Sequence, residues 1–201
     1  MIRPICFLGL LFALAGPASA QALNVDFGRA TAPPSATYGG AADKPGEWHQ
    51  VADLGQSVLV VEPPHAKVSL TLVADNIDGN LTAPATDLGL LVGDNFFSAQ
   101  ASSWSVSISG LKKGSYDVYV YAAANSLVPT GDFTVNGIFV PSFGPATGST
   151  MNLGIDYQVV HGVPVAAHGD SLSIQTVNIS GYGGLSGMQL VPVASHGEHG
   201  K

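Results

Sequence analysis

Residues 104–123 read WSVSISGLKKGSYDVYVYAA, and this stretch decides the fold. In its first half, Trp104, Val106 and Ile108 alternate with three serines, the period of two that marks a strand with one buried face and one wet face. Residues 110–114 supply a turn. The second half is dense in Val and Tyr, which suit a pleated sheet. The stretch therefore predicts a β-hairpin with a connection of about five residues.

The same alternation recurs along the chain between loops rich in Gly, Pro, Asn and Ser. Clear examples are LNVDF at 23–27, VSLTL at 68–72 and LSIQT at 172–176. About eight to ten short strands can be placed in this way, and no long helical pattern occurs. Such spacing predicts an all-β chain, either a β-sandwich or a barrel. Because the sequence has neither a fixed-period repeat nor a dividing linker, one domain is expected.

The first twenty residues have the pattern of a signal peptide. Arg3 is followed by an apolar run at 5–15 that is too short to span a bilayer, and Ala18-Ser19-Ala20 forms a small-residue cleavage site. We expect cleavage before Gln21, a domain over 21–194, and a flexible tail over 195–201. The protein is then secreted, periplasmic or extracellular, with no membrane span after signal cleavage. Cys6, the single cysteine, would leave with the signal peptide, so no disulfide or thiolate site is expected.

The composition excludes some classes of partner. The 201 residues are 46% hydrophobic and 10% charged, whereas an ordinary soluble domain is roughly 25% charged. The formal net charge of −7 gives no electrostatic attraction to nucleic acid or to an anionic membrane surface. Solubility must therefore depend on Ser, Thr, Asn and Gln.

Several segments occur in an order that resembles a known family. They are LNVDFG, GEWHQV, the stretch at 104–123, GDFTVNG, and GDSLSIQTV followed by GGLSGMQLVPV. The chain resembles the jelly-roll domains of the galactose-binding-like superfamily in exported bacterial proteins. This resemblance implies an antiparallel jelly-roll β-sandwich. It further implies a glycan or cell-surface polysaccharide as ligand, because the family includes carbohydrate-binding modules, accessory domains of polysaccharide-degrading enzymes and adhesion domains.

The sequence motifs that would indicate a catalytic site are weak, and we expect that the protein is not an enzyme. The segment GLSGM around Ser186 does not fit the Gly-x-Ser-x-Gly elbow of many hydrolases. Glycoside cleavage needs two carboxyl groups that face each other across a sugar site. Candidates for such a pair are Asp26, Glu47, Asp94 and Asp132, but solvated or turn-forming roles are the favoured interpretation for them.

Three aspartates are candidate metal ligands. Asp75 and Asp78 lie in DNIDGN, which resembles a calcium loop, although Ile77 occupies a ligand position and no Glu follows. An Asx-rich turn is therefore the favoured interpretation of this segment. The family resemblance implies a structural calcium held by backbone carbonyls and acids of the first and last strands, and Asp26 is the residue placed for that role.

A glycan site would combine an aromatic platform with amide hydrogen bonds in loops at one end of the sandwich. The residues that meet this test are Tyr38, Trp48, Asn95, Phe96, Asn125 and Tyr182. Tyr182, between two glycines, is the favoured contact. Trp48 has packing as a rival role, and one of the adjacent Phe96 and Phe97 is expected in the core because neighbours in a strand point in opposite directions.

These observations predict a monomeric, non-catalytic ligand-binding domain with a glycan as ligand. The alternatives are a structural or adhesive matrix protein without a small-molecule site and, third, a small polysaccharide-active hydrolase. An exposed Tyr182 or Trp48 at a concave loop end would favour binding. An unprotected edge strand or a flat apolar patch would favour the matrix role. A pocket with two converging titratable groups would favour an enzyme.

Overall fold

The structure is a computed structural model that describes residues 22–29, 32–61, 66–78, 85–99, 102–124, 128–147, 150–167 and 170–194. The predicted signal peptide and C-terminal tail lie outside the described residues. The chain folds mainly into β-strands, with one short α-helix and one 3₁₀ turn in the part described. The predicted all-β sandwich is confirmed.

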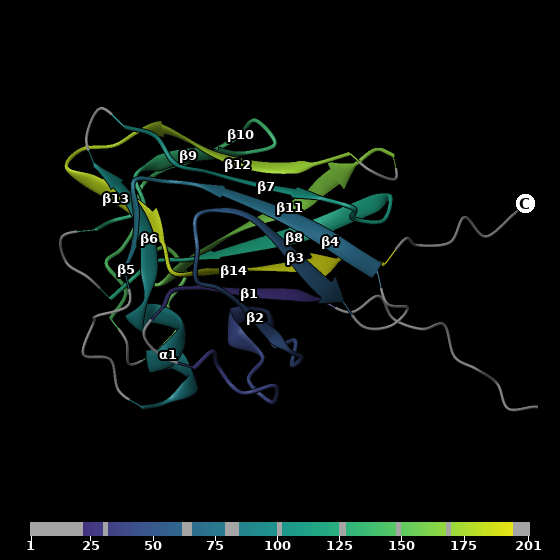
Figure 1. Ribbon diagram of the computed structural model, residues 1–201, viewed down its shortest axis with the longest axis horizontal. Coiled ribbons are helices and arrows are strands. Elements are labelled where there is room, and N and C mark those ends of the chain that lie inside the picture. The colour runs from purple at the N-terminus through teal and green to yellow at the C-terminus, as the bar shows by residue number, and fades with distance from the viewer. Residues whose placement is uncertain are drawn as a thin grey trace, which may run out of the picture.

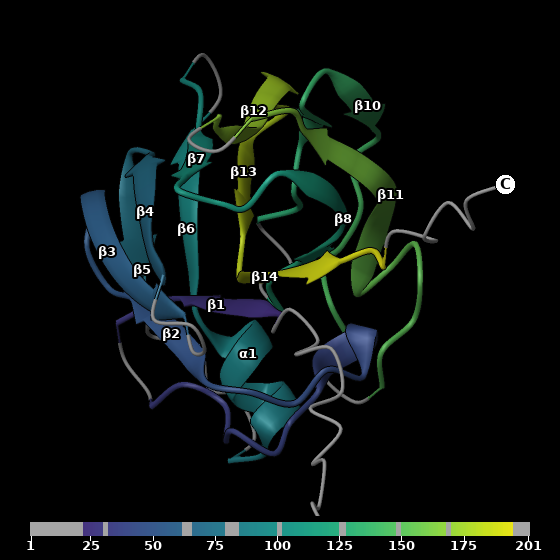
Figure 2. The ribbon, with the colours of Figure 1, turned by 90° about the vertical axis from the view of Figure 1, so that its right-hand side faces the viewer.

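Two large sheets face each other, and a small third sheet lies at one end (Figures 1 and 2). Sheet A has the order β11 (Tyr157–Val165), β8 (Gly114–Tyr121), β14 (Gly187–Pro192), β1 (Leu23–Phe27) and β2 (Trp48–Val51). Sheet B has the order β10 (Ile138–Val140), β9 (Asp132–Val135), β12 (Leu172–Asn178), β7 (Ser105–Ser109), β4 (Ala66–Val73) and β3 (Gly55–Val61). Sheet C has the order β13 (Tyr182–Leu185), β6 (Asn95–Ala99) and β5 (Asn76–Asp78).

The stretch at 104–123 forms two strands as predicted, but the predicted hairpin is wrong. β7 pairs with β4 and β12 in sheet B, whereas β8 pairs with β11 and β14 in sheet A. The connection is therefore an arch that crosses from one sheet to the other. The physical reason is that each strand has one apolar face. When the two strands lie in opposite sheets, these apolar faces pack against each other in the core and both are removed from water. Leu111, in the arch, is itself buried.

The main core lies between sheets A and B. Trp104, Val106 and Ile108 are at most 1% exposed, as the sequence predicts. Trp104 contacts Phe96 edge-on, with ring centroids 5.3 Å apart, and contacts Phe133 at 5.7 Å. The ring of Phe96, from the small sheet C, thus packs against Trp104 and so extends the core between the two large sheets to the end of the sandwich.

A second, smaller core covers the outer face of sheet A, where buried polar side chains hold a loop in place. Gln189 Nε2 donates to Asn24 Oδ1 at 2.8 Å and to the Gly39 carbonyl oxygen at 3.0 Å. The Tyr121 hydroxyl donates to Gln189 Oε1 and accepts from the Ala41 amide at 2.9 Å. The 3₁₀ turn η1 (Gly40–Ala42) is thereby fixed against the sheet. Because buried polar groups are costly unless paired, this network sets where the loop lies.

The helix α1 (Asp87–Gly93) covers the neighbouring part of the same face (Figure 2). Thr86 caps its first turn, with its hydroxyl accepting from the Gly89 amide at 3.1 Å. Leu91 is fully buried in the smaller core, beside Trp48 and Tyr121. The outer face of β1 is therefore covered, and all five residues of this strand are buried.

Replacing Trp104 by Ala should destabilise the fold by about 3–5 kcal/mol, because it removes the largest fully buried side chain. Trp104→Phe should cost much less. Phe keeps the ring contacts, and it removes an indole N–H that has no hydrogen-bond partner among the described residues. Urea unfolding measures both values; equal losses in the two variants would contradict this account of the core.

Candidate functional site

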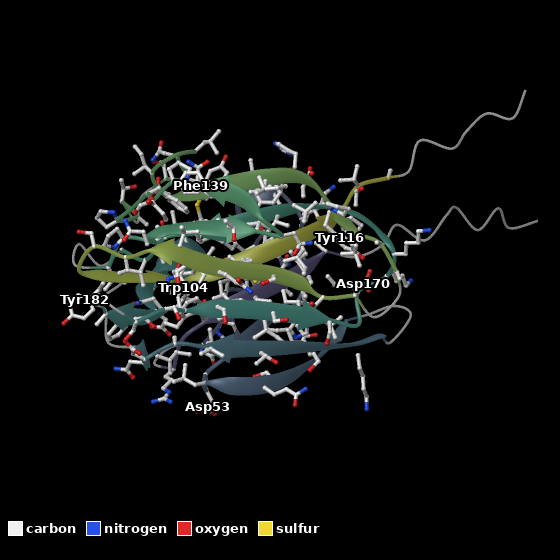
Figure 3. The ribbon with its side chains drawn as sticks, turned by 90° about the horizontal axis from the view of Figure 1, so that it is seen from above. Asp53, Trp104, Tyr116, Phe139, Asp170 and Tyr182 are labelled. Atoms are coloured by element: carbon white, nitrogen blue, oxygen red, sulfur yellow. The ribbon has the colours of Figure 1, made fainter. Side chains whose placement is uncertain are left out.

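An aromatic pair lies on the small sheet at one end of the sandwich. Phe97 of β6 and Tyr182 of β13 meet edge to face, with ring centroids 5.7 Å apart and an interplanar angle of 87°. Tyr182 is 45% exposed and Phe97 is half-buried. In Figure 3, Tyr182 lies at the outermost end of the molecule. We call Phe97 and Tyr182 the aromatic pair.

The backbone under the aromatic pair leaves no room for a further side chain. Gly184 lies opposite Phe97 in the β13–β6 register. A Cβ at Gly184 would lie 1.8 Å from the Phe96 carbonyl oxygen, so only glycine fits there. Gly183 is also tightly enclosed, with the place of its Cβ 3.1 Å from the Thr130 carbonyl oxygen. The two glycines therefore let β13 approach its neighbours closely and fix the position of Tyr182.

Two polar residues at the start of β5, Asp75 and Asn76, lie alongside β6, the strand that carries Phe97. Asp75 Oδ2 accepts from the Ala99 amide at 2.9 Å, and the Asp75 amide donates to the Phe97 carbonyl oxygen at 3.1 Å. Asn76, the first residue of β5, accepts at its Oδ1 from the amide of the next residue, Ile77, at 2.9 Å. Both side chains are exposed. The start of β5 is thus tied to β6, and Asp75 serves as a hydrogen-bond acceptor there.

The prediction that Phe96 contacts a ligand is wrong. Phe96 is fully buried, with its ring 4.9 Å from that of Phe27 and 5.3 Å from that of Trp104. Because adjacent strand residues face opposite ways, Phe97 is the one that faces outward. The sequence reveals this alternation but not its phase, which depends on which face of sheet C meets the core.

Trp48 and Asn95, two other predicted contacts, are also buried. Trp48 is 3% exposed, donates its indole N–H to the Tyr38 carbonyl oxygen at 2.9 Å, and stacks on the half-buried Tyr38 at 6.0 Å. This burial agrees with packing, the alternative role that the sequence suggested for Trp48. Asn95 is 0% exposed at the start of β6. Asn125 lies outside the described residues. The ring contacts do not bring Tyr38 and Trp48 together with Tyr182.

A pair of buried aspartates is the second unusual feature. Asp26 of β1 is 0% exposed, and neither of its carboxylate oxygens has a hydrogen-bond partner among the described residues. Asp94, which ends α1, is also 0% exposed and packs over Gly28, where an added Cβ would lie 1.9 Å from the Asp94 Cβ. We call Asp26 and Asp94 the acid pair. The next residue is Asn95, whose buried Oδ1 has no hydrogen-bond partner in the described segments of the chain.

Burial, and then the nearby charge of Asp94, raises the pKa of Asp26 to about 8. A charged, buried carboxylate without a partner is costly, so the site favours either a proton or a cation on this group. The oxygens of two carboxylates and one amide form a hard donor set, which suits Ca²⁺. No group of three or more His, Cys, Asp or Glu gathers in the described part of the chain, so such an ion would also need backbone or water oxygens.

The predicted metal candidates fall in different places. Asp26 belongs to the acid pair, and Asp78 pairs in register with Asn95 along β5 and β6. Asp75 lies instead at the start of β5, where its carboxylate accepts from the Ala99 amide of β6. Sequence analysis considered Asp94 only as a catalytic carboxylate and missed its place beside Asp26. The one local signal was the segment Gly93-Asp94-Asn95, which interrupts the apolar pattern after the run at 88–92.

Fold and site together define an all-β sandwich that exposes an aromatic pair at one end. No protein-family model matches the sequence, and no curated protein matches it. Two solved structures are similar to it, the ANX2 ectodomain and the ANXUR2 extracellular domain, both from Arabidopsis thaliana. The TM-scores are 0.43 and 0.46, each at 13% identity over 89% of this chain. The chain spans about half the length of each (50% and 49%).

Across the residues that the structure describes, no helix combines the length and the apolar character needed to cross a bilayer.

The acid pair should make stability depend on pH. The folded-state pKa of Asp26, about 8, lies above its ordinary value of 3.8, so the folded protein holds the proton more tightly. The stability that this proton contributes is complete below about pH 3.8 and is lost as the pH rises toward about 8, by about 1.4 kcal/mol per pH unit. Asp26→Asn, which cannot ionise, should remove this slope.

Urea unfolding between about pH 5 and 8 in the presence of a chelator measures the slope. Asp43→Asn is the matched control, because Asp43 is an exposed carboxylate. Equal slopes in the wild type and in Asp26→Asn would contradict the assignment.

Proposed function

We propose that the chain is an exported, non-catalytic domain of the galactose-binding-like jelly-roll type that binds a glycan at the end carrying the aromatic pair. The observation that supports this most is the exposed ring of Tyr182, held edge-on by Phe97 on a sheet whose glycines fix its position. An exposed aromatic ring on a rigid element, with polar groups beside it, is the arrangement that recognises a ring with one apolar face and several hydroxyls.

Binding would use stacking and hydrogen bonding together. The Tyr182 ring would cover the C–H face of a sugar, while Asp75 and Asn76 would bond its hydroxyls. Because the ring is already ordered by Phe97, little side-chain freedom is lost on binding. The contact area of a single exposed ring is small, so we expect weak affinity that multivalent presentation would raise.

The charges of the domain favour a neutral glycan. Asp75 places a carboxylate at the backbone amide of Ala99, the residue opposite Tyr182 in the β13–β6 register. The turn at 111–113 carries two lysines and lies next to Tyr116, whose hydroxyl donates to the Lys112 carbonyl oxygen at 2.8 Å. Tyr116 lies toward the opposite end from Tyr182 (Figure 3). Arg29 is paired with Asp53 at 3.4 Å. An acidic glycan would therefore meet a carboxylate rather than a cation at the proposed site.

Tyr182→Ala should weaken glycan binding about tenfold, equivalent to about 1.4 kcal/mol, because it removes the stacking surface. Phe97→Ala should weaken it less, since Phe97 acts mainly by holding the tyrosine ring. A glycan array with neutral and acidic members identifies the ligand, and calorimetry then compares the variants.

Phe139→Ala is the matched control, because Phe139 is an aromatic residue that is 58% exposed on β10 and away from the pair. If the protein bound no glycan on the array, the proposal would be refuted. Retention that Tyr182→Ala leaves unchanged would place the ligand elsewhere.

We further propose a structural calcium at the acid pair. Asp26, Asp94 and Asn95 would hold it, and the ion would supply positive charge that keeps two buried carboxylates ionised. This is supported by the two Asp26 oxygens, which have no hydrogen-bond partner in the part of the chain that the structure describes, and by the hard oxygen ligands of the trio, which includes no Cys or His. The ion would tie the end of α1 and the start of β6 to β1.

Calcium at about a hundredfold excess over its dissociation constant should raise the melting temperature by about 5–10 °C. Asp26→Asn should abolish this rise, whereas Asp43→Asn should leave it intact. Calorimetric scans with calcium, magnesium and chelator make the comparison. If calcium stabilised the wild type and Asp26→Asn equally, the ion would bind elsewhere.

A further inference from the structure

Sheet B ends in an edge strand that differs from the other edges of the two large sheets. β3 is the last strand of the sheet, and its one hydrogen-bonded neighbour in the described part of the chain is β4. Its seven residues, GQSVLVV, contain no charged residue and no proline. Short segments of high β-propensity without charge or proline are those that pair most readily with another strand.

The other edges carry features that oppose such pairing. β11 is interrupted by an irregularity between Val160 and Val163, and Pro164 within it lacks an N–H. β10 has three residues and β2 has four. Short strands, bulges and prolines are devices that prevent edge-to-edge association. β3 has none of them over its seven residues.

Apolar surface continues beside the open edge. Leu54, directly before β3, is 39% exposed, and Val73, at the end of β4, is 54% exposed. The register pairs Gly55 with Leu72, so Leu54 and Val73 lie next to each other at the same end of this hairpin. Gln56, on β3, is also exposed.

We propose that a second copy of this chain pairs with β3, strand β3 against strand β3, in antiparallel orientation. Two identical segments that pair antiparallel are related by a two-fold axis. The free backbone N–H and C=O groups of each β3 then pair with those of the other copy, and no unpaired β3 edge is left to add a third copy. No like charges meet along the strand, because it has none. Sequence analysis expects a monomer; the open edge argues instead for a weak, reversible dimer.

The geometry of this dimer would give it a distinct use. The strands of sheet B run along the long axis of the molecule, and Tyr182 lies at one end of it (Figures 1 and 3). Antiparallel pairing therefore points the two aromatic pairs in opposite directions. If the proposed glycan site is correct, the dimer would bridge two glycan surfaces rather than hold one surface twice.

Sedimentation velocity over a range of protein concentrations tests the dimer without any ligand. The wild type should dimerise reversibly. Gln56→Lys, at an exposed position of β3, should weaken dimerisation about tenfold or more, because it introduces a positive charge along the pairing edge of each copy. Val177→Lys is the matched control, since Val177 is 62% exposed on the central strand β12. It should leave the dissociation constant unchanged to within about twofold.

Circular dichroism verifies that each variant is folded, and Gln56→Glu, which also adds a charge at this exposed position, replaces Gln56→Lys if the latter unfolds. Hydrogen exchange should show that β3 amides become protected as the concentration rises. A protein that stays monomeric up to its solubility limit would overturn the proposal. A dimer that Val177→Lys weakens as much as the edge variants do would overturn it as well.

Discussion

Burial of both faces of β1 is the constraint on which the rest of the molecule depends. Leu23, Val25 and Phe27 face the core between the two large sheets, and Asn24 and Asp26 face the other way. A strand of alternating apolar and polar residues normally leaves its polar face in water. Here the loop around η1 and the helix α1 cover that face, so each polar residue on it requires a partner. Asn24 has Gln189, whereas Asp26 has the charge of Asp94 beside it.

β6 links this constraint to the exposed end of the sandwich. Three consecutive residues of the strand belong to three different environments. Asn95 lies beside the acid pair, Phe96 packs in the main core, and Phe97 holds Tyr182. Under the proposed function, an ion near Asp26 would fix the start of this strand, and with it the position of Phe97. In the proposed function, charge balance inside the protein and recognition at its surface are therefore connected through one short strand.

The sequence predicted much of this fold because burial follows the period of two. The phase of Trp104, Val106 and Ile108 is correct, since three apolar residues in one phase can have only one buried face. The partners of that strand were not predictable, because an arch and a hairpin have the same local pattern and differ only in long-range pairing. The same limit explains the error at Phe96: two adjacent aromatic residues define an alternation without its phase.

The candidate site was predictable to a smaller degree. Tyr182 stands between glycines, a local signal of an exposed turn or a close backbone approach, and it is exposed. The closeness of Asp26 and Asp94 arises from residues 68 positions apart that meet only when α1 packs against β1. No short motif encodes such a contact. Trp48 and Asn95 were predicted as ligand contacts because they were expected in loops at one end of the sandwich, with packing as the alternative for Trp48, but tertiary packing covers both.

The position of β14 between β1 and β8 has a consequence for how the polypeptide matures. β1 pairs with β14 from Leu23↔Leu190 to Asp26↔Gly187, which joins an early segment to a late one. Until residue 190 has left the ribosome, β1 and β2 lack the neighbour that connects them to the rest of sheet A. A topology with such distant pairings folds slowly and late, because loop closure comes before most of its contacts. β1 and β2 therefore stay unattached to the rest of sheet A until β14, the last strand of the chain's described part, has been synthesised.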